Sequence, residues 1–433
     1  MNGTDSDVLP WVDAAQAVAR LPRSGRVAVG GNATEPTALV AALAASGARF
    51  RELEVVQTLS FGADALVTAA LRGHLRINSV FIGPAVRDAV ARADADYTPV
   101  FISDVPALFR PGGRLALDAA LVQVSPPDAH GWCSLGPSVD VLRAAVDHAP
   151  IVIAEVNPRV PRTHGASSVH VSRLTALVRS DTPLATFSPE ATDASRQRIA
   201  ERIAELIEDG STLQVGFGSI PEATLARVRD RRDLGIHSEW FSDGMMALVE
   251  CGAATGVRKP RWAGKAVASF ILGSEALYRW ADDNAALEMQ PSDVTNNPAL
   301  IAANPKMVAI NSAISIDLTG QVNADSVGHR FYSGVGGQAD FLRGAAQSDG
   351  GRAIVALPST ARGGTVSRVV GTLAPGAGVV TTRADVRFVV TEWGRVDLHG
   401  LSVRQRAHAL ITLAHPRFRD ALTAEAKALA YLA

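Results

Sequence analysis

Apolar runs alternate with alanine-rich stretches through the first part of the chain. The run at 151–156 is apolar on both faces, which is typical of a parallel strand covered by helices on both sides. The pattern predicts a helix over 37–45 and strands at 26–30, 53–58, 77–82, 99–102, 119–124 and 151–156. We therefore expect a doubly wound α/β domain over residues 1–185.

A second α/β domain is predicted over residues 193–433. Prolines and weak periodicity place a linker at 181–192, and the apolar stripe that follows predicts a helix ending at Gly210. After a strand at 213–218, Ser219 and Glu222 have the order of a capping box at the start of a helix. Further strands are predicted at 307–311, 353–357, 378–382 and 386–391.

The stretch 235–256 has the pattern of a strand, a turn and a short helix. An apolar-leaning run at 234–240 gives way to a Ser-Asp-Gly turn, and a helical pattern then ends at Gly252. Glu239 is thereby predicted to lie where a strand ends. Ligands of open α/β sheets bind beyond the carboxyl ends of the strands. Glu239 is our candidate nucleophile, although an ion-paired or exposed glutamate would also explain this residue taken alone.

Composition and charge narrow the function classes. The 433 residues are 47% hydrophobic and 20% charged, which is ordinary for globular proteins of more than one domain. A net charge of −1 gives no general attraction to nucleic acid, and no apolar run approaches the ~20 residues of a membrane span. The N-terminus lacks the order of a signal peptide, and two cysteines are too few for a disulfide framework. We expect a cytoplasmic protein of enzyme size.

Two glycine-rich turns are candidate ligand-binding loops. The first follows a predicted strand and consists of Gly216, Phe217, Gly218, Ser219 and Ile220. Free N–H groups at the start of the next helix favour anions such as phosphates, although a turn without a ligand often has this composition. Its spacing is not GxGxxG, which argues against a nicotinamide dehydrogenase. In the second turn, Gly336 and Gly337 follow Ser333 and could aim N–H groups at an oxyanion, or serve chain reversal only.

Other polar clusters have simpler explanations. Asn296 and Asn297 precede a proline and fit an Asx turn before a helix. The densest cationic cluster, which suits phosphates but also a solvated surface, is Arg258, Lys259, Arg261 and Lys265. Two histidines are interpreted as hydrogen-bonding or packing groups, His164 and His237. The cysteines are interpreted as small buried apolar residues, Cys133 and Cys251.

Longer motifs follow one another almost from end to end of the chain. They include SPPDAHGWCSLG (125–136), EVNPRVPRTHG (155–165), VGFGSIPEA (215–223), IHSEWFSDG (236–244) and SGVGGQADFLRGA (333–345). Their sequence and order resemble those of the acetyl-CoA hydrolase/4-hydroxybutyrate coenzyme A-transferase family, of the class I CoA-transferase type. The resemblance implies two α/β/α open-sheet domains with the active site between them.

The resemblance also assigns roles to residues. The glutamate of the family's H-[ST]-E motif is the nucleophile, which here is Glu239. The coenzyme A loop matches the first glycine turn, and oxyanion donors are expected at Gly336 and Gly337. Further CoA contacts are expected at Ser333, Gly337, Asn296, Asn297 and Arg352, the last replacing a usual lysine.

The first domain, 1–185, is expected to set acyl and carboxylate specificity, and the second, 193–433, to hold the nucleophile and CoA. The expected carboxylate pocket includes Gly30, Gly31 and Asn32. The chain departs from the family at Trp240, where methionine is commoner, so Trp240 is expected to reshape the acyl pocket. It also departs at 393–397.

The implied reaction is transfer of CoA from an acyl-CoA to a free carboxylate, with ping-pong kinetics through a glutamyl-CoA thioester. An acyl-CoA hydrolase would use the same intermediate, with water replacing the second carboxylate. A CoA-binding regulatory protein without catalysis is a more distant alternative. The expected ligands are acyl-CoA and small carboxylates, with no metal, redox cofactor, nucleic acid or membrane, and the family leads us to expect a homodimer.

Overall fold

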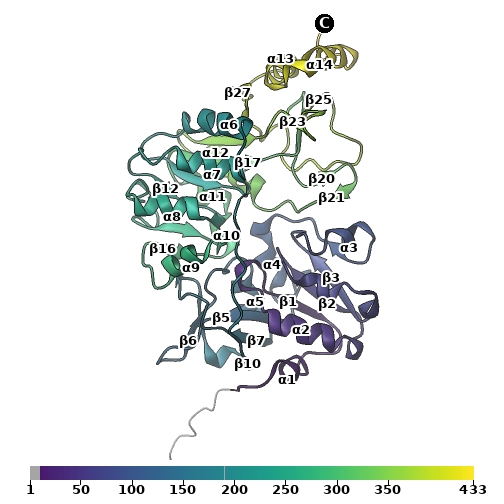
Figure 1. Cartoon of the computed structure of the whole chain (residues 1–433), viewed down its shortest axis with the longest axis vertical. Helices are drawn as coiled ribbons and strands as arrows, with labels where there is room; N and C mark the ends of the chain where they lie inside the picture. Colours follow the sequence, from purple (N-terminus) through teal and green to yellow (C-terminus); the bar gives the residue numbers. More distant parts are fainter. Residues whose placement is uncertain (1–9, 190) are drawn as a thin grey trace, which may run out of the picture. The chain divides into compact units, whose positions relative to one another are not determined.

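The computed structural model describes residues 10–189 and 191–433, which form two compact units. The first unit comprises residues 10–100, 104–187 and 269–292, and the second 101–103, 188–268 and 293–433. Figure 1 shows parallel strands flanked by helices within each unit. The predicted second domain counts 269–292 as its own, whereas this segment packs in the first unit. Ser269 accepts backbone hydrogen bonds there from Val139 and Asp140.

The first unit is built on a seven-stranded sheet in the order β10-β7-β5-β1-β2-β3-β4. Every neighbouring pair is parallel. The strands are β1 (Arg26–Val29), β2 (Leu53–Gln57), β3 (Leu75–Ser79), β4 (Asp96–Tyr97), β5 (Ala119–Val124), β7 (Ile151–Val156) and β10 (Ala176–Arg179). The helices are α1 (Ala14–Val18), α2 (Thr37–Ala45), α3 (Arg87–Ala91), α4 (Val105–Phe109), α5 (Leu142–His148) and α9 (Glu275–Ala281). Smaller paired strands are β6 (Trp132–Ser134) with β9 (Ser168–His170), and β8 (His164–Gly165) with β16 (Leu287–Met289).

Helix α2 is held over the sheet by apolar packing and by a buried carboxylate. Leu39 and Leu43 share a core cluster with Val55 and Ile77 of the sheet. The Glu155 carboxylate, at the end of β7, accepts hydrogen bonds from the backbone N–H groups of residues 38 and 39. A carboxylate satisfies both the unpaired donors and the partial positive charge of a helix N-terminus.

The second unit is built on a six-stranded sheet in the order β12-β11-β17-β22-β26-β27. The strands are parallel except for β27, which pairs antiparallel with β26. They are β11 (Thr212–Val215), β12 (Gly235–Ile236), β17 (Met307–Ser312), β22 (Arg352–Ala356), β26 (Phe388–Thr391) and β27 (Gly394–Asp397). Short strands of this unit are β13 (Trp240–Phe241), β14 (Ala266–Ala268), β18 (Ser315–Asp317), β19 (Val322–Asn323), β20 (Ser326–Val327), β21 (Arg330–Phe331), β23 (Thr360–Ala361), β24 (Val366–Ser367) and β25 (Val369–Val370).

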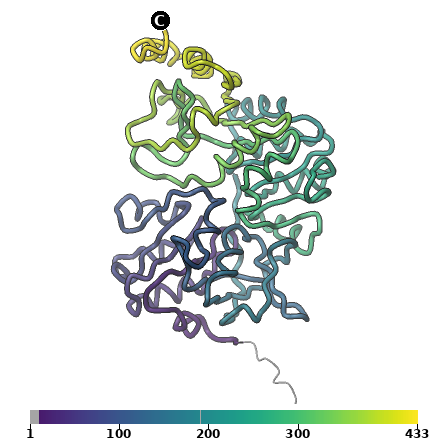
Figure 2. The backbone as a smooth tube through the Cα atoms, turned by 180° about the vertical axis from the view of Figure 1, so that it is seen from behind, coloured from purple at the N-terminus to yellow at the C-terminus, as the bar shows by residue number. Residues whose placement is uncertain are grey.

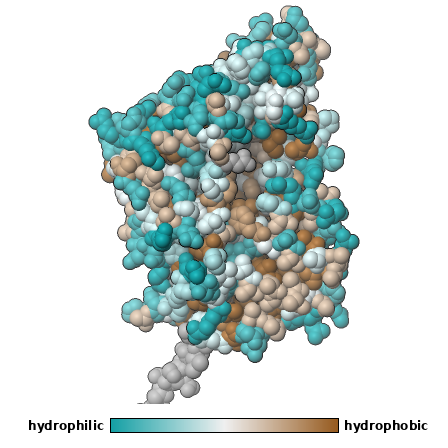
Figure 3. All heavy atoms as spheres, viewed as in Figure 1, coloured by the Kyte–Doolittle hydropathy of each residue, from teal (hydrophilic) through white to brown (hydrophobic). Residues whose placement is uncertain are grey.

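Helices cover this second sheet and complete its core. They are α6 (Ala194–Ala204), α7 (Ser219–Ala226), α8 (Asp243–Glu250), α11 (Pro298–Ala302), α12 (Gln338–Gln347), α13 (Val403–Leu413) and α14 (Pro416–Ala428), and a short turn, α10 (Ser292–Thr295), precedes α11. One core cluster joins Ile301 of α11 and Phe341 of α12 to Met307 and Val355 of the sheet. Figure 2 shows α13 and α14 in yellow at the C-terminal end of the chain, and Figure 3 shows mostly hydrophilic residues over the region of α6.

Most predicted elements are present, and three predictions are wrong. Residues 99–102 form no strand, because Pro99 cannot donate to a ladder and Phe101 makes only an isolated bridge with Gly336. Residues 378–382 likewise contribute only a bridge, at Thr381. The predicted capping box is absent, because the N-cap of α7 is Gly218 and makes no side-chain cap.

Candidate functional site

The segment that carries Glu239 runs between two short strands and into α8. The backbone N–H of His237 donates to Leu213 of β11, and that of Ser238 donates to Val267 of β14, at 3.0 Å each. Ser242 then caps α8, with its hydroxyl accepting from the N–H of residue 245. The predicted strand is thus shorter than expected, but backbone hydrogen bonds fix the chain immediately before Glu239, whose side chain is half-buried.

Glu239 meets Asn296 and Gly337, which come from distant parts of the sequence. The Asn296 carboxamide donates from Nδ2 to Glu239 Oε2 at 2.5 Å. A Cβ atom at Gly337 would lie 2.0 Å from Glu239 Oε2 and 2.2 Å from Asn296 Nδ2, so no side chain fits there. Gly337 is also the N-cap of α12, whose partial positive charge favours a carboxylate. The structure therefore brings together three of the predicted site residues.

The first glycine turn contacts the same segment. The Phe217 ring stacks on Trp240, with ring centroids 4.3 Å apart and an interplanar angle of 16°. Gly218 has φ +134°, a conformation that L side chains rarely adopt, and it leads directly into α7. Trp240 is 2% exposed, so its indole supports the glycine turn from beside Glu239.

A second contact between α7 and the nucleophile segment was missed in the sequence. The carboxyl of Glu222, predicted to cap its own helix, instead lies beside Ser242 and Gly244 at the start of α8. Burial raises the pKa of Glu222 above its ordinary range. An alanine at Gly244 would place Cβ 2.5 Å from Glu222 Oε2. In the sequence, the only indication of this contact was the absence of a side chain at Gly244, two residues after Ser242.

The remaining predicted CoA residues are distributed unevenly. The side-chain oxygen of Asn297 accepts from two N–H groups and caps α11, which confirms the predicted Asx-type turn. Ser333 is half-buried, and its N–H donates to Asp325 O at 3.1 Å. Arg352 begins β22 and pairs in register with Val308 near the start of β17. It therefore lies at the amino edge of the parallel sheet, opposite the glycine turn that follows β11.

The predicted carboxylate pocket is a tightly held turn of the first unit. Asn32 has φ +55°, which asparagine tolerates, and its N–H donates to Leu59 O. A Cβ at Gly31 would lie 2.5 Å from the same carbonyl oxygen, so this close approach requires glycine. Asn32 Nδ2 donates to Asp140 Oδ2 at 2.8 Å. Burial raises the pKa of Asp140 to about 6. Hydrogen bonds from two backbone N–H groups and from Asn32 lower this pKa, but their effect is smaller than that of burial.

The cysteines, the cationic cluster and the two histidines were given structural interpretations, and the structure agrees with some of these and not with others. Cys133 is buried, and burial raises the pKa of its thiol to about 11. The prediction that Cys251 is buried is wrong, because it lies exposed at the end of α8. Lys259 does not lie on a solvated surface: it is only 2% exposed, and its Nζ donates to two carbonyl oxygens. His164 Nε2 lies 3.0 Å from Asp283 Oδ1, and His237 is buried and hydrogen-bonded.

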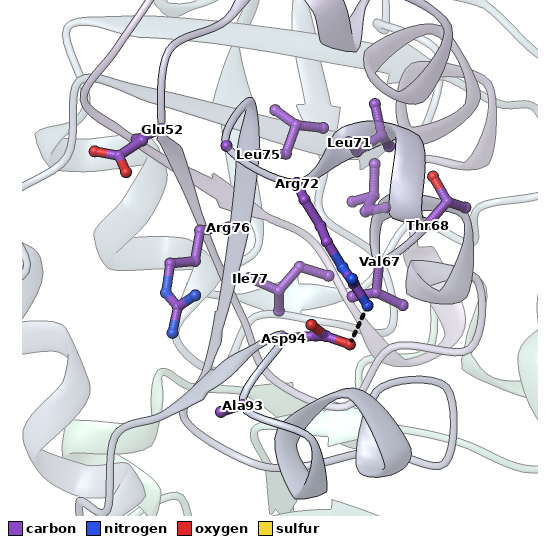
Figure 4. Close-up of a pocket in the computed structure, with 12 residues that line it drawn as sticks. Glu52, Val67, Thr68, Leu71, Arg72, Leu75, Arg76, Ile77, Ala93 and Asp94 are labelled. Carbon is purple, nitrogen blue, oxygen red and sulfur yellow. Dashed lines mark hydrogen bonds and ion pairs between the residues drawn. The ribbon is translucent and has the colours of Figure 1, made fainter.

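A separate cavity of about 210 Å³ lies in the first unit. Figure 4 shows Arg72 reaching Asp94 across its lining, which includes Leu71 and Ile77. This cavity contains none of the predicted site residues. Within residues 10–189 and 191–433, no group of three or more His, Cys, Asp or Glu could hold a metal ion. No helix in that part of the chain is long and apolar enough to cross a membrane.

Comparison with known proteins identifies close relatives. The chain is 44% identical over 416 residues to the 4-hydroxybutyrate coenzyme A transferase of Clostridium kluyveri, covering 96% of this chain and 97% of that protein. It is 48% identical over 353 residues to a succinyl-CoA:acetate/propanoyl-CoA:succinate CoA transferase of Fasciola hepatica, covering 81% and 73%. A crystal structure of 4-hydroxybutyrate CoA-transferase from Porphyromonas gingivalis superposes with a TM-score of 0.84 at 37% identity, covering 97% and 98%.

Two family domains match the chain in order. Residues 11–187 match the acetyl-CoA hydrolase/transferase N-terminal domain, and residues 273–426 match the C-terminal domain. Together with relatives above 30% identity over nearly the whole chain, these matches show that the protein is a member of the acetyl-CoA hydrolase/transferase family.

Proposed function

We propose that this protein is a CoA-transferase that moves CoA between an acyl-CoA and a free short-chain carboxylate, such as acetate, butyrate or 4-hydroxybutyrate. The reaction passes through a glutamyl-CoA thioester on Glu239. The observation that carries this proposal is the meeting of Glu239, Asn296 and Gly337, because a carboxamide donor and the N-terminus of α12 converge on one half-buried carboxylate. Family membership and the transferase relatives support the reaction class.

The first half-reaction loads CoA onto the enzyme. The Glu239 carboxylate attacks the thioester carbonyl, the C–S bond breaks, and a mixed anhydride forms while CoA leaves as a thiolate. The thiolate then attacks the glutamyl carbonyl and releases the first carboxylate. A covalent intermediate of this kind divides one difficult exchange into easier steps.

The second half-reaction is the reverse with a new carboxylate. That carboxylate attacks the glutamyl thioester, the thiolate leaves, and the thiolate then attacks the acyl carbonyl of the new anhydride. The products are a new acyl-CoA and the regenerated Glu239 carboxylate. Every group that makes or breaks a bond is a carboxylate or a thiolate, so the proposal requires neither a metal nor a redox cofactor.

The surrounding residues have separate roles. Donors at the N-terminus of α12, at Gly336 and Gly337, stabilise the tetrahedral oxyanions, and the loss of one such donor typically costs about 10²–10³ in rate. The turn Gly216–Gly218 binds CoA, and the Phe217–Trp240 stack keeps that turn against the nucleophile segment. The family resemblance supports a role in carboxylate selectivity for the turn around Asn32. We also propose a homodimer, as expected for the family, which light scattering measures.

Trapping of the intermediate tests the proposal. The protein is incubated with acetyl-CoA, butyryl-CoA or succinyl-CoA without an acceptor, and its intact mass is measured. The expected gain is one CoA less one water, removable by hydroxylamine and mapped by peptide analysis to Glu239. Turnover without an adduct, or an adduct that persists in Glu239→Gln, would contradict the mechanism.

The same experiment separates transfer from hydrolysis. For a transferase, acyl-CoA consumption in steady state depends on added carboxylate and returns a new acyl-CoA in equal amount. For a hydrolase, consumption proceeds without an acceptor and releases free CoA. A protein that binds acyl-CoA but neither consumes it nor forms the adduct would be a non-catalytic CoA-binding protein.

A further inference from the structure

We propose that His237 and Thr295 are positioning residues for the nucleophile. A chain of three hydrogen bonds runs from His237 through Thr295 and Asn296 to Glu239, and holds the Asn296 carboxamide with its N–H toward Glu239. This inference rests on the proposed role of Glu239, but it concerns residues to which the reaction itself gives no part.

The first link joins the nucleophile segment to the loop before α11. His237 lies two residues before Glu239, is 1% exposed, and has its Nε2 2.9 Å from the carbonyl oxygen of Thr295. A carbonyl oxygen only accepts, so His237 donates from Nε2. Burial and the nearby charges of Lys259 and Arg261 lower the pKa of His237 to about 3, so the ring is neutral and has a single N–H.

The second link anchors the end of the Asn296 carboxamide that faces away from the nucleophile. The Thr295 hydroxyl donates to Asn296 Oδ1 at 2.8 Å, which leaves Nδ2 to donate to Glu239 Oε2. In the reversed orientation, Oδ1 would face a carboxylate oxygen with no proton between them, and Nδ2 would face the hydroxyl. The Glu239 carboxylate therefore favours the observed orientation, and the Thr295 hydroxyl anchors the far end of the carboxamide in it.

The hydrogen bonds form a closed ring with the backbone of residues 237–239, and a closed ring is more rigid than an open chain. The series of hydrogen bonds begins at His237 and ends at Glu239, while its middle members, Thr295 and Asn296, are fully buried. The His237 ring also lies edge-on to Phe341 of α12, with centroids 6.4 Å apart, and α12 begins directly after Gly337. The same histidine thus contacts both segments that converge on Glu239.

Replacement of the Thr295 hydroxyl gives the sharpest test, because Thr295→Val keeps the shape and the backbone carbonyl. We measure the rate of CoA adduct formation on Glu239 in a single turnover with acetyl-CoA. One hydrogen bond that orients a catalytic group predicts a loss of about tenfold in this rate. The KM for acyl-CoA should stay within about twofold, and Thr295→Ser, which keeps the hydroxyl, should restore the rate.

A double-mutant cycle distinguishes positioning from general structural support. If Thr295 acts through the carboxamide, Thr295→Val should cause no further loss in an Asn296→Ala background. At the other end, His237→Gln can place an N–H near the position of Nε2 and should keep most of the rate, whereas His237→Leu should lose it. A fully additive double mutant, or a wild-type rate in Thr295→Val, overturns the inference.

These outcomes are separable from failure of the proposed function. An adduct that forms on Glu239 at the wild-type rate in Thr295→Val rejects the positioning role and leaves the nucleophile in place. An adduct that still forms in Glu239→Gln rejects the nucleophile itself. Should His237→Leu fail to fold, the two Thr295 variants and the double-mutant cycle still decide the question.

Discussion

Gly337→Ala should abolish most of the activity while leaving the fold intact. The new Cβ atom would lie 2.0 Å from Glu239 Oε2 and 2.2 Å from Asn296 Nδ2, whereas carbon contacts are normally at about 3.5–4.0 Å. The two side-chain ends must therefore move by about 1.5 Å. The backbone is not strained by the change, because Gly337 has φ −97°.

The magnitude of the loss follows from that displacement. A misplacement of about 1 Å can cost about 10²-fold in rate, and the loss of an oxyanion donor about 10²–10³-fold. We expect kcat to fall by about 10²–10³, or roughly 3–4 kcal/mol of transition-state stabilisation. Stability should fall by about 1–3 kcal/mol, because the displaced Asn296 carboxamide is fully buried and hydrogen-bonded, while Gly→Ala also restricts the unfolded chain and offsets part of the loss.

Gly371→Ala provides a matched control. Its Cβ would lie 2.0 Å from the Glu425 carboxyl carbon, so the same substitution enters the same kind of contact beside α14. We measure kcat for both variants at saturating acyl-CoA and carboxylate, and Tm by thermal unfolding. Gly371→Ala should keep kcat within about twofold. A folded Gly337→Ala protein that retained kcat within about threefold would show that the close approach to Glu239 serves packing only.

Two further perturbations test the site. Burial raises the pKa of Asp140 from 3.8 to about 6, so the folded state binds this proton more tightly and stability falls as pH rises between about 4 and 6. Asp140→Asn removes that dependence. The free energy of unfolding in urea, wild type minus Asp140→Asn, should be ~2 kcal/mol larger at pH 4.5 than at pH 7.5. An equal difference at both pH values would contradict the assignment. Phe217→Leu removes a stack worth about 0.5–1.5 kcal/mol, so initial rates should give a KM for acyl-CoA about three- to tenfold higher. The same change in a Trp240→Leu background should add little, and full additivity would show that Phe217 acts elsewhere.

The sheets were predictable because their signal is local. The apolar run of β7 and the alternation in β11 lie within a few residues, and the structure places strands there. The segment around Glu239 was harder, since β12 and β13 have only two residues each, and the N–H groups of His237 and Ser238 between them donate to residues of β11 and β14. Periodicity cannot report such partners, so it predicted one longer strand.

Among the site residues too, local features were predictable and contacts between distant segments were not. Glycines in turns are visible in a sequence, and Gly337 was therefore found, although nothing local indicated that its missing side chain makes room for Glu239 and Asn296. Glu222 was assigned to its own helix because Ser-x-x-Glu is a local pattern, whereas its carboxyl lies against Gly244 at the start of α8. The partner of a polar side chain depends on the tertiary structure, and the local spacing of residues carries no information about it.

The contacts that sequence could not predict share a physical logic. Glu239, Asn296 and Gly337 lie in three separate connecting segments. Glu239 follows residues held by backbone hydrogen bonds, Asn296 accepts from the Thr295 hydroxyl, and Gly337 is the N-cap of α12. A carboxylate that must be charged, aimed and partly exposed cannot be held by burial alone, because burial disfavours the charge. Donors placed on one of its oxygens can hold it without neutralising it. The buried His237, neutral and with one N–H, suits that supporting task, because it can hold the Thr295 carbonyl without adding a buried charge of its own.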